Sequence, residues 1–213
     1  MELVIFDCDG VLVDSERLCV RVDAQIFAEL GIHFTEAEII EKFVGSSGEV
    51  YRAIVEERLG RPLEDGWHDA YEYLYDELFE AELTAVDGVV TVLDALDARG
   101  VPYCVASNGS HQAVRRSLAL TGLAERFPEG RIFSAADVAR GKPEPDLFLH
   151  AARAMGARAE RCSVVEDSPY GVRAARAAGM RAFGYCGGLT RADRLLGPGT
   201  VVFDEMRELA GLL

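Results

Sequence analysis

Short apolar runs alternate with stretches of helical periodicity over most of the chain. The first apolar run is residues 3–6, and from residue 87 onward helical and strand-like patterns follow one another. Glycines such as Gly100 and Gly122 come directly after helical stretches, as is typical of helix ends. This alternation predicts a parallel sheet covered by helices. The expected helices are 89–99, 112–120, 146–155 and 171–178, and the expected later strands are 103–106, 132–133, 163–165, 182–183 and 201–203.

A different pattern fills residues 14–84. Apolar residues recur every four positions from Leu18 to Leu30, which indicates one face of a helix, and more helical text follows without a convincing strand. We therefore predict an α/β fold with a doubly wound, Rossmann-like parallel sheet. Its core comprises residues 1–13 and 85–213, and residues 14–84 form an inserted α-helical domain.

Composition excludes several classes of protein. No apolar run among the 213 residues approaches the roughly 18 residues that a membrane span requires. The net charge of −14 argues against nucleic-acid binding, which depends on basic surfaces. Residues 14–84 hold 18 acidic against 6 basic side chains, so most of the negative charge lies in the insert. With no leader-like pattern at the N-terminus, we expect a cytoplasmic protein that binds neither membranes nor nucleic acids.

Polar residues follow three of the predicted strands at the point where each strand ends. Asp7 and Asp9 follow the first run, Ser107 and Asn108 follow 103–106, and Glu166-Asp167 follows 163–165. Ligands of open α/β sheets bind beyond the carboxyl ends of the strands, so these groups should share one rim. Two carboxylates beside free backbone suit a hard cation such as Mg²⁺, although Asp and Gly also mark ordinary strand-ending turns.

Lys142 is a further candidate at the same rim. The chain has 20 arginines but only two lysines, and Lys142 lies in a Gly-Lys-Pro-Glu-Pro segment directly ahead of a predicted helix. The two prolines restrict the local backbone. The alternative interpretation is a solvated lysine on a turn.

These four segments, in this order and spacing, resemble the motifs of the haloacid dehalogenase superfamily of phosphohydrolases. Asp7-Cys8-Asp9-Gly10-Val11 is similar to its first motif, Ser107-Asn108 to the second, Lys142 to the third and Glu166-Asp167 to the fourth. The helical insert resembles the small C1-type cap domain of this family, which closes over the site and helps to select the substrate.

The resemblance implies a role for each motif residue. Asp7 would be the nucleophile that forms an aspartyl-phosphate, and Asp9 would protonate the leaving alcohol and then activate water. Ser107, the Asn108 backbone and Lys142 would donate to the phosphoryl oxygens. The cofactor would be Mg²⁺, held by the Asp7 side chain, the Asp9 carbonyl, Asp167 and, directly or through water, Glu166.

The function expected from this resemblance is Mg²⁺-dependent hydrolysis of a small phosphomonoester by a monomer or weak homodimer. Asp9 favours phosphate esters, because family members that cleave carbon–halogen or carbon–phosphorus bonds generally lack it. Within the family the chain is most similar to 6-phosphogluconate phosphatases, which predicts a sugar phosphate or a sugar-acid phosphate as substrate. Gly45-Ser46-Ser47-Gly48 would be the substrate-facing loop of the cap, or a plain turn.

Two other functions remain open from the sequence. A β-phosphoglucomutase-like sugar-phosphate mutase is the first, but those enzymes carry a histidine where this chain has Cys19 and a cap arginine where it has Gly48. The second is a non-catalytic binding protein on the same fold. Such a protein should have lost at least one of the motif residues Asp7, Asp9, Lys142 and Asp167, and all of them are present.

Overall fold

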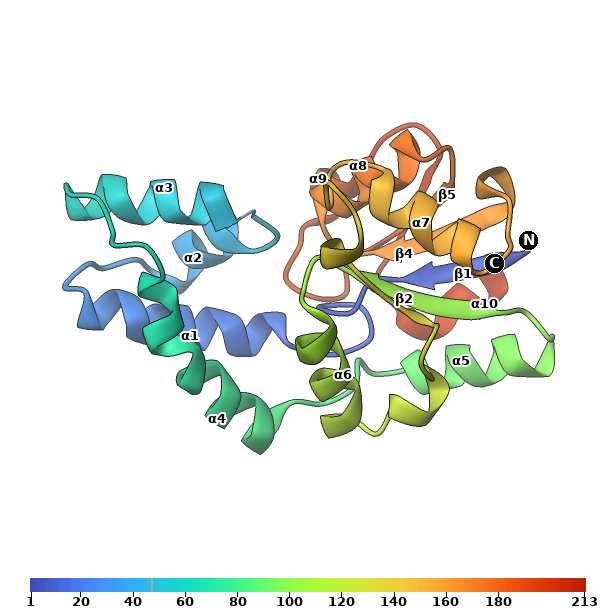
Figure 1. Cartoon of the computed structure of the whole chain (residues 1–213), viewed down its shortest axis with the longest axis horizontal. Coiled ribbons are helices and arrows are strands. Elements are labelled where there is room, and N and C mark those ends of the chain that lie inside the picture. Colours follow the sequence, from blue (N-terminus) through green and yellow to red (C-terminus); the bar gives the residue numbers. More distant parts are fainter. Residues whose placement is uncertain (47) are drawn as a thin grey trace.

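A computed structural model describes residues 1–46 and 48–213 and contains one six-stranded parallel sheet (Figure 1). The strand order is β3-β2-β1-β4-β5-β6, so β1 lies at the centre between β2 and β4. Each neighbouring pair in this order is parallel, which confirms the predicted doubly wound α/β fold. The strands are β1 (Leu3–Phe6), β2 (Tyr103–Ser107), β3 (Ile132–Ser134), β4 (Cys162–Glu166), β5 (Arg181–Tyr185) and β6 (Thr200–Phe203).

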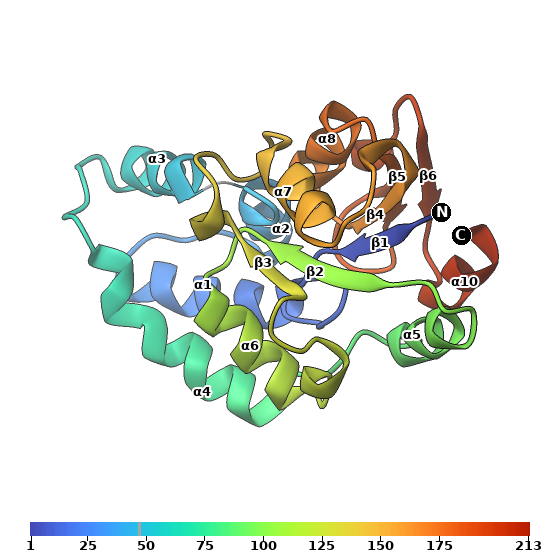
Figure 2. The same ribbon diagram turned by 45° about the vertical axis from the view of Figure 1, so that its right-hand side comes forward.

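Helices cover both faces of the sheet (Figure 2). In β1 the side chains of Val4 and Phe6 join a buried cluster with α5 and α6, whereas Leu3 and Ile5 join a second cluster with α7 and α8. Apolar residues on both faces of a strand explain why its sequence is a continuous run rather than an alternating pattern. These helices are α5 (Val89–Ala98), α6 (His111–Leu120), α7 (Asp146–Ala154), α8 (Pro169–Ala177), α9 (Ala192–Leu195) and α10 (Leu209–Leu212).

The insert, called the cap below, packs three of its four described helices, α1, α2 and α3, around a core of its own. Phe27 is buried at its centre, and the rings of Phe43 and Tyr51 lie 4.8 and 5.9 Å from the Phe27 ring. Thr35 begins one helix with a capping box that it forms with Glu38. The cap helices are α1 (Glu16–Glu29), α2 (Glu36–Phe43), α3 (Gly48–Leu59) and α4 (Glu72–Glu82), with a 3₁₀ turn at Trp67–Tyr71.

The cap lies beyond the carboxyl ends of β1 and β2 (Figure 1). Its two connections to the core run side by side, because the Asp14 N–H donates to the Thr84 carbonyl at 2.9 Å and Val13 forms an antiparallel bridge with Ala85. The proposed domain boundaries fall at these two connections. Arg116 of α6 also reaches across to α4, where it pairs with Asp76 and, at 2.8 Å, with Glu80.

Every helix and strand that the sequence predicts overlaps an element of the structure. Among the described residues, the short elements of the core were missed, namely α9, α10 and four 3₁₀ turns, because three or four residues are too few to show a period. Within residues 1–46 and 48–213, none of the helices has both the length and the hydrophobicity that crossing a membrane would need.

Candidate active site

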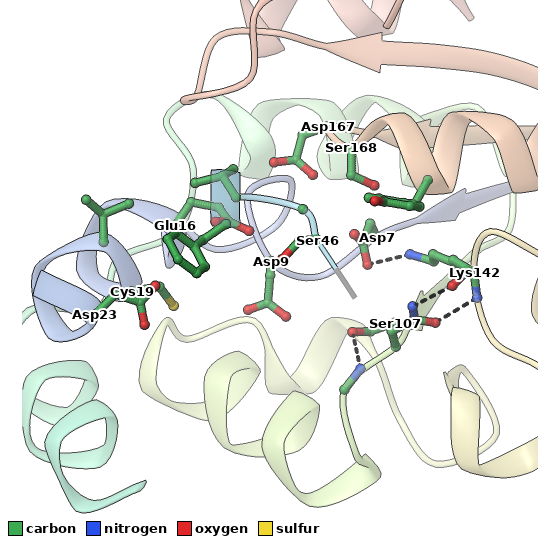
Figure 3. Close-up of a pocket in the computed structure, with 17 residues that line it drawn as sticks. Asp7, Asp9, Glu16, Cys19, Asp23, Ser46, Ser107, Lys142, Asp167 and Ser168 are labelled. Carbon is green, nitrogen blue, oxygen red and sulfur yellow. Dashed lines mark hydrogen bonds and ion pairs between the residues drawn. The ribbon is translucent and has the colours of Figure 1, made fainter. Parts of the chain in front are cut away.

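The four predicted motifs meet at the carboxyl ends of the central strands (Figure 3). Asp7 directly follows β1, and its N–H donates to the Val165 carbonyl at 2.9 Å, which extends the ladder between β1 and β4 by one residue. Glu166, the last residue of β4, therefore lies beside Asp7. Parallel pairing thus brings together two carboxylates that are 159 positions apart in the sequence.

Lys142 holds these two carboxylates together. Its Nζ lies 2.7 Å from Asp7 Oδ1 and 2.6 Å from Glu166 Oε1, and its side chain is only 4% exposed. Burial alone lowers the pKa of a lysine, but here the two adjacent carboxylates outweigh burial and the pKa of Lys142 is raised. Lys142 is therefore a permanent cation inside the site, rather than the solvated turn residue of the alternative interpretation.

Asn108 positions the backbone of the lysine. Its amide Nδ2 donates to the Lys142 carbonyl at 3.1 Å, and the Lys142 N–H donates to Asn108 Oδ1 at 2.9 Å. Gly141 leaves room for this contact, since a Cβ there would lie 2.5 Å from Asn108 Oδ1. The Asn108 side chain thus links the second motif to the third. Sequence reasoning did not foresee this role, since it assigned only the Asn108 backbone to phosphate.

Ser107, the other residue of the second motif, lines the same space. It is buried at the end of β2, and its Oγ accepts a hydrogen bond from the Gly109 N–H at 3.0 Å. The hydroxyl proton remains available to a ligand, because a serine oxygen can accept one hydrogen bond and donate another.

Asp9 is held by a residue that the sequence did not single out as part of the site. Ser15, fully buried at the start of the cap, donates from Oγ to Asp9 Oδ1 at 2.8 Å. Burial raises the pKa of Asp9, and the hydrogen bond from Ser15 opposes this rise only in part. Raising the pKa of a carboxyl group favours its protonated form, which is the form that can deliver a proton to a leaving group.

Three carboxylates form a cluster that could hold a cation. Oxygen atoms of Asp7, Glu166 and Asp167 lie within 4.8 Å of one another, and all three residues are buried or nearly so. Burial and then the neighbouring Glu16 raise the pKa of Asp167 well above its usual range. Carboxylate oxygens at this spacing fit a hard divalent cation such as Mg²⁺.

The members of this cluster differ in how many oxygens they have free. Glu166 uses Oε1 for Lys142, while its Oε2 accepts from the Ser168 N–H at 2.9 Å and from Ser168 Oγ at 2.8 Å. Asp7 uses only Oδ1, which also accepts from the Cys8 N–H at 2.7 Å. In the described part of the chain, nothing donates to Asp7 Oδ2 or to Asp167. These two residues are therefore better placed than Glu166 to bind a metal directly.

A cavity of about 300 Å³ opens above the cluster, between the core and the cap. Its walls include the predicted loop residues Gly45 and Ser46, and the buried Ser46 Oγ has no hydrogen-bond partner among the residues described. Ser47 lies outside the described residues. Gly48 lines a neighbouring pocket and not this cavity.

Helix α1 provides a wall that sequence reasoning missed. Glu16, Cys19 and Asp23 all line the cavity and are spaced three and four residues apart, so they lie on one face of the helix. That spacing is visible in the sequence. Of these three residues the sequence analysis discussed only Cys19, because the mutases have a histidine at that position.

Glu16 gives the metal-free protein a specific pH dependence. Burial raises its pKa to about 7, and the carboxylates of Asp9 and Asp23 add to the rise. Because the folded pKa lies above the unfolded one, the stabilisation from Glu16 is complete below the unfolded pKa and is lost as the pH rises through about 7.

We therefore expect the free energy of unfolding in EDTA to fall between about pH 5 and pH 8, and to fall less steeply in Glu16→Gln. Urea unfolding across this range measures both slopes. Glu57→Gln, which removes an exposed carboxylate of α3, should follow the wild type. Equal slopes for Glu16→Gln and the wild type would contradict the assignment.

The chain is similar to known proteins in sequence and in fold. The model of the haloacid dehalogenase-like hydrolase family matches residues 1–179. The chain is 36% identical over 190 residues to 6-phosphogluconate phosphatase of Escherichia coli (strain K12), covering 87% of this chain and 83% of that protein.

Two solved structures are similar over the whole chain. A haloacid dehalogenase-like protein of unknown function from Agrobacterium tumefaciens is 38% identical with a TM-score of 0.87, covering 100% of this chain and 97% of that one. A haloacid dehalogenase family hydrolase from Deinococcus radiodurans, with bound phosphate and sodium, is 34% identical with a TM-score of 0.82 and the same coverage. The chain belongs to the haloacid dehalogenase-like hydrolase family.

Proposed function

We propose that the protein is a Mg²⁺-dependent phosphatase that hydrolyses a small phosphorylated metabolite through an aspartyl-phosphate intermediate. The substrate would be a sugar phosphate or a sugar-acid phosphate such as 6-phosphogluconate. One observation carries the proposal. Asp7 and Asp9 line the same cavity, where Lys142 holds the first and Ser15 the second, so a nucleophile and a proton donor stand side by side.

The phosphoryl group would bind between the ends of β1 and β2. Ser107, the Asn108 N–H and Lys142 are the donors for its oxygens, and all three residues line the cavity. Asn108 and Glu166 fix Lys142 from its backbone and its side chain respectively, so little reorganisation would be needed when charge develops in the transition state.

Asp7 would attack phosphorus through one carboxylate oxygen, and its other oxygen would remain for the cation. A bond forms between the attacking oxygen and phosphorus while the bond from phosphorus to the ester oxygen breaks. Asp9 donates its proton to the ester oxygen, so the alcohol leaves neutral. In the second step Asp9 takes a proton from water, whose oxygen bonds to phosphorus as the bond from phosphorus to Asp7 breaks, so phosphate leaves and the Asp7 carboxylate is restored.

The residues that would hold Mg²⁺ are Asp7 and Asp167 through their side chains and Asp9 through its carbonyl. Glu166, whose oxygens are engaged by Lys142 and Ser168, would act through water or by holding the cluster together. When bound, the cation would reduce the repulsion between the anionic nucleophile and the anionic phosphate.

The mutase alternative receives less support from the cavity. A mutase must bind the second phosphate of a bisphosphate, and Lys142 is the one lysine or arginine among the described lining residues. Cys19 occupies the wall where mutases have a histidine, and an uncharged thiol cannot replace an imidazole as a proton carrier at neutral pH. Burial raises the pKa of Cys19, which keeps the thiol protonated.

Asp7→Asn should lower kcat for phosphate release by at least about a thousandfold, since an amide cannot act as the nucleophile. The assay is release of inorganic phosphate, with Mg²⁺ present, from 6-phosphogluconate, hexose phosphates, hexitol phosphates, phosphoglycolate and nucleotides. Asp69→Asn, which changes an exposed cap carboxylate, should retain full activity. An active Asp7→Asn protein would rule out the covalent route, and no release from any ester would rule out the phosphatase.

Mg²⁺ should stabilise the folded protein. At about a hundred times its dissociation constant it would add about 2.7 kcal/mol to the free energy of unfolding. Asp167→Asn should lose this increment, and it should be more stable than the wild type in EDTA because one of the crowded carboxylates is gone. Thermal unfolding with and without Mg²⁺ measures both effects. An undiminished Mg²⁺ response in Asp167→Asn would remove Asp167 from the metal site.

A further inference from the structure

The cap side of the cavity carries acidic groups that the chemistry of phosphate transfer does not use. Glu16 and Asp23 project from the face of α1 that lines the cavity, and Figure 3 shows Asp23 on the opposite side of Asp9 from Lys142. Because Lys142 marks the phosphate end, Asp23 lies where the leaving group of a bound ester would extend.

Asp23 is held in place by two tyrosines. Tyr51 and Tyr75 both donate from their hydroxyls to Asp23 Oδ1, at 2.8 and 2.6 Å. The His68 ring lies behind them, with Nε2 3.3 Å from the Tyr75 hydroxyl. Two separate cap helices, α3 and α4, thus donate to one carboxylate, and the 3₁₀ turn supports the second of them through His68.

The second oxygen of Asp23 has no such partner. Asp23 as a residue is 6% exposed, and in the described part of the chain no group donates to its Oδ2. Ser46 Oγ, in the same cavity wall, is buried without a partner. A buried hydroxyl without a partner costs free energy unless a ligand supplies the missing hydrogen bond, and Asp23 Oδ2 is free to accept a hydrogen bond from the same ligand. Hydroxyl groups are such ligands, because each can donate to a carboxylate and accept from a serine.

No positive charge faces this end of the cavity. The described lining residues include five carboxylates and the single cation Lys142, which is already paired with Asp7 and Glu166. Arg52, an arginine of the cap, lines the neighbouring pocket and not this cavity. Its guanidinium is bound to Glu56, Asp65 and the Leu63 carbonyl.

We propose that Asp23 is a specificity-determining residue, and that its free oxygen, together with Glu16 and Ser46, selects an uncharged polyhydroxy leaving group. The substrate class is then a phosphorylated polyol or neutral sugar, and sugar acids are rejected. This inference rests on the proposed phosphatase function and narrows it. A leaving-group carboxylate would lie beside the carboxylates of Glu16 and Asp23, and the described lining residues offer it no lysine or arginine other than Lys142, which is already paired.

The sharpest test uses two substrates that differ only in this group. Glucitol 6-phosphate and 6-phosphogluconate are both open six-carbon chains, but the first ends in a CH₂OH group and the second in a carboxylate. With Mg²⁺ present, kcat/KM of the wild type for glucitol 6-phosphate should exceed that for 6-phosphogluconate by at least about tenfold.

Asp23→Asn removes the charge but keeps an Oδ1 acceptor for Tyr51 and Tyr75. It should reduce the ratio of the two kcat/KM values by at least about threefold, mainly through a lower KM for 6-phosphogluconate. Glu57→Gln removes one charge from the exposed face of the same cap and should leave the ratio unchanged. This control separates a local contact from the general negative field of the cap.

The outcomes are distinguishable. A wild-type ratio of one or below overturns the inference whether or not Asp23→Asn folds, and so does a ratio that Asp23→Asn leaves unchanged. Equal shifts in Asp23→Asn and Glu57→Gln would assign the selectivity to the overall charge and also overturn the role of Asp23. Failure to hydrolyse either compound, or any other phosphomonoester, would instead overturn the phosphatase function on which the inference rests.

Discussion

The balance of charge around Lys142 is the constraint on which the site depends. Asp7, Glu166 and Asp167 are gathered at the ends of two adjacent strands, where burial and the neighbouring carboxylates raise the pKa of Asp7 and of Asp167. One ammonium group, in contact with two of them, offsets part of this repulsion. The remaining repulsion between the carboxylates must be offset by bound protons or by a divalent cation. A site that is short of positive charge attracts a divalent cation, and the bound cation would in turn allow an anionic phosphate to approach the carboxylates.

The sequence predicted the sheet and its rim well because both follow from local patterns. Continuous apolar runs gave the buried strands, and parallel topology then required Asp7, Ser107 and Glu166 to share one edge. The resemblance to a known family added the order of the motifs. It also supplied roles for residues such as Asn108, whose side-chain contact with the Lys142 backbone no periodicity could reveal.

The contacts between segments that are distant in the chain could not be predicted from the sequence. The sequence analysis did not assign Ser15 a contact with Asp9, yet its hydroxyl donates to that carboxylate. It did not single out Asp23 either, although Asp23 is buried and accepts hydrogen bonds from Tyr51 and Tyr75, which lie 28 and 52 residues away. Such pairings depend on how the cap helices pack, and that packing leaves little local trace in an acidic, helical sequence. This is the physical reason why the sequence of the cap predicts fewer of its contacts than the sequence of the core does.

The paired connections between core and cap have a consequence for how such a protein can change. Because the chain leaves the core at Val13 and returns at Ala85 through a two-stranded bridge, the ends of the insert are fixed close together. For the stability of the core, residues 14–84 therefore behave like a loop whose two ends are close together, whatever the loop contains. Lengthening a loop between fixed ends carries only a small entropic cost. A different helical insert that kept Ser15 beside Asp9 could be grafted at the same two points without disturbing the sheet, so the choice of substrate can change while the reaction is retained.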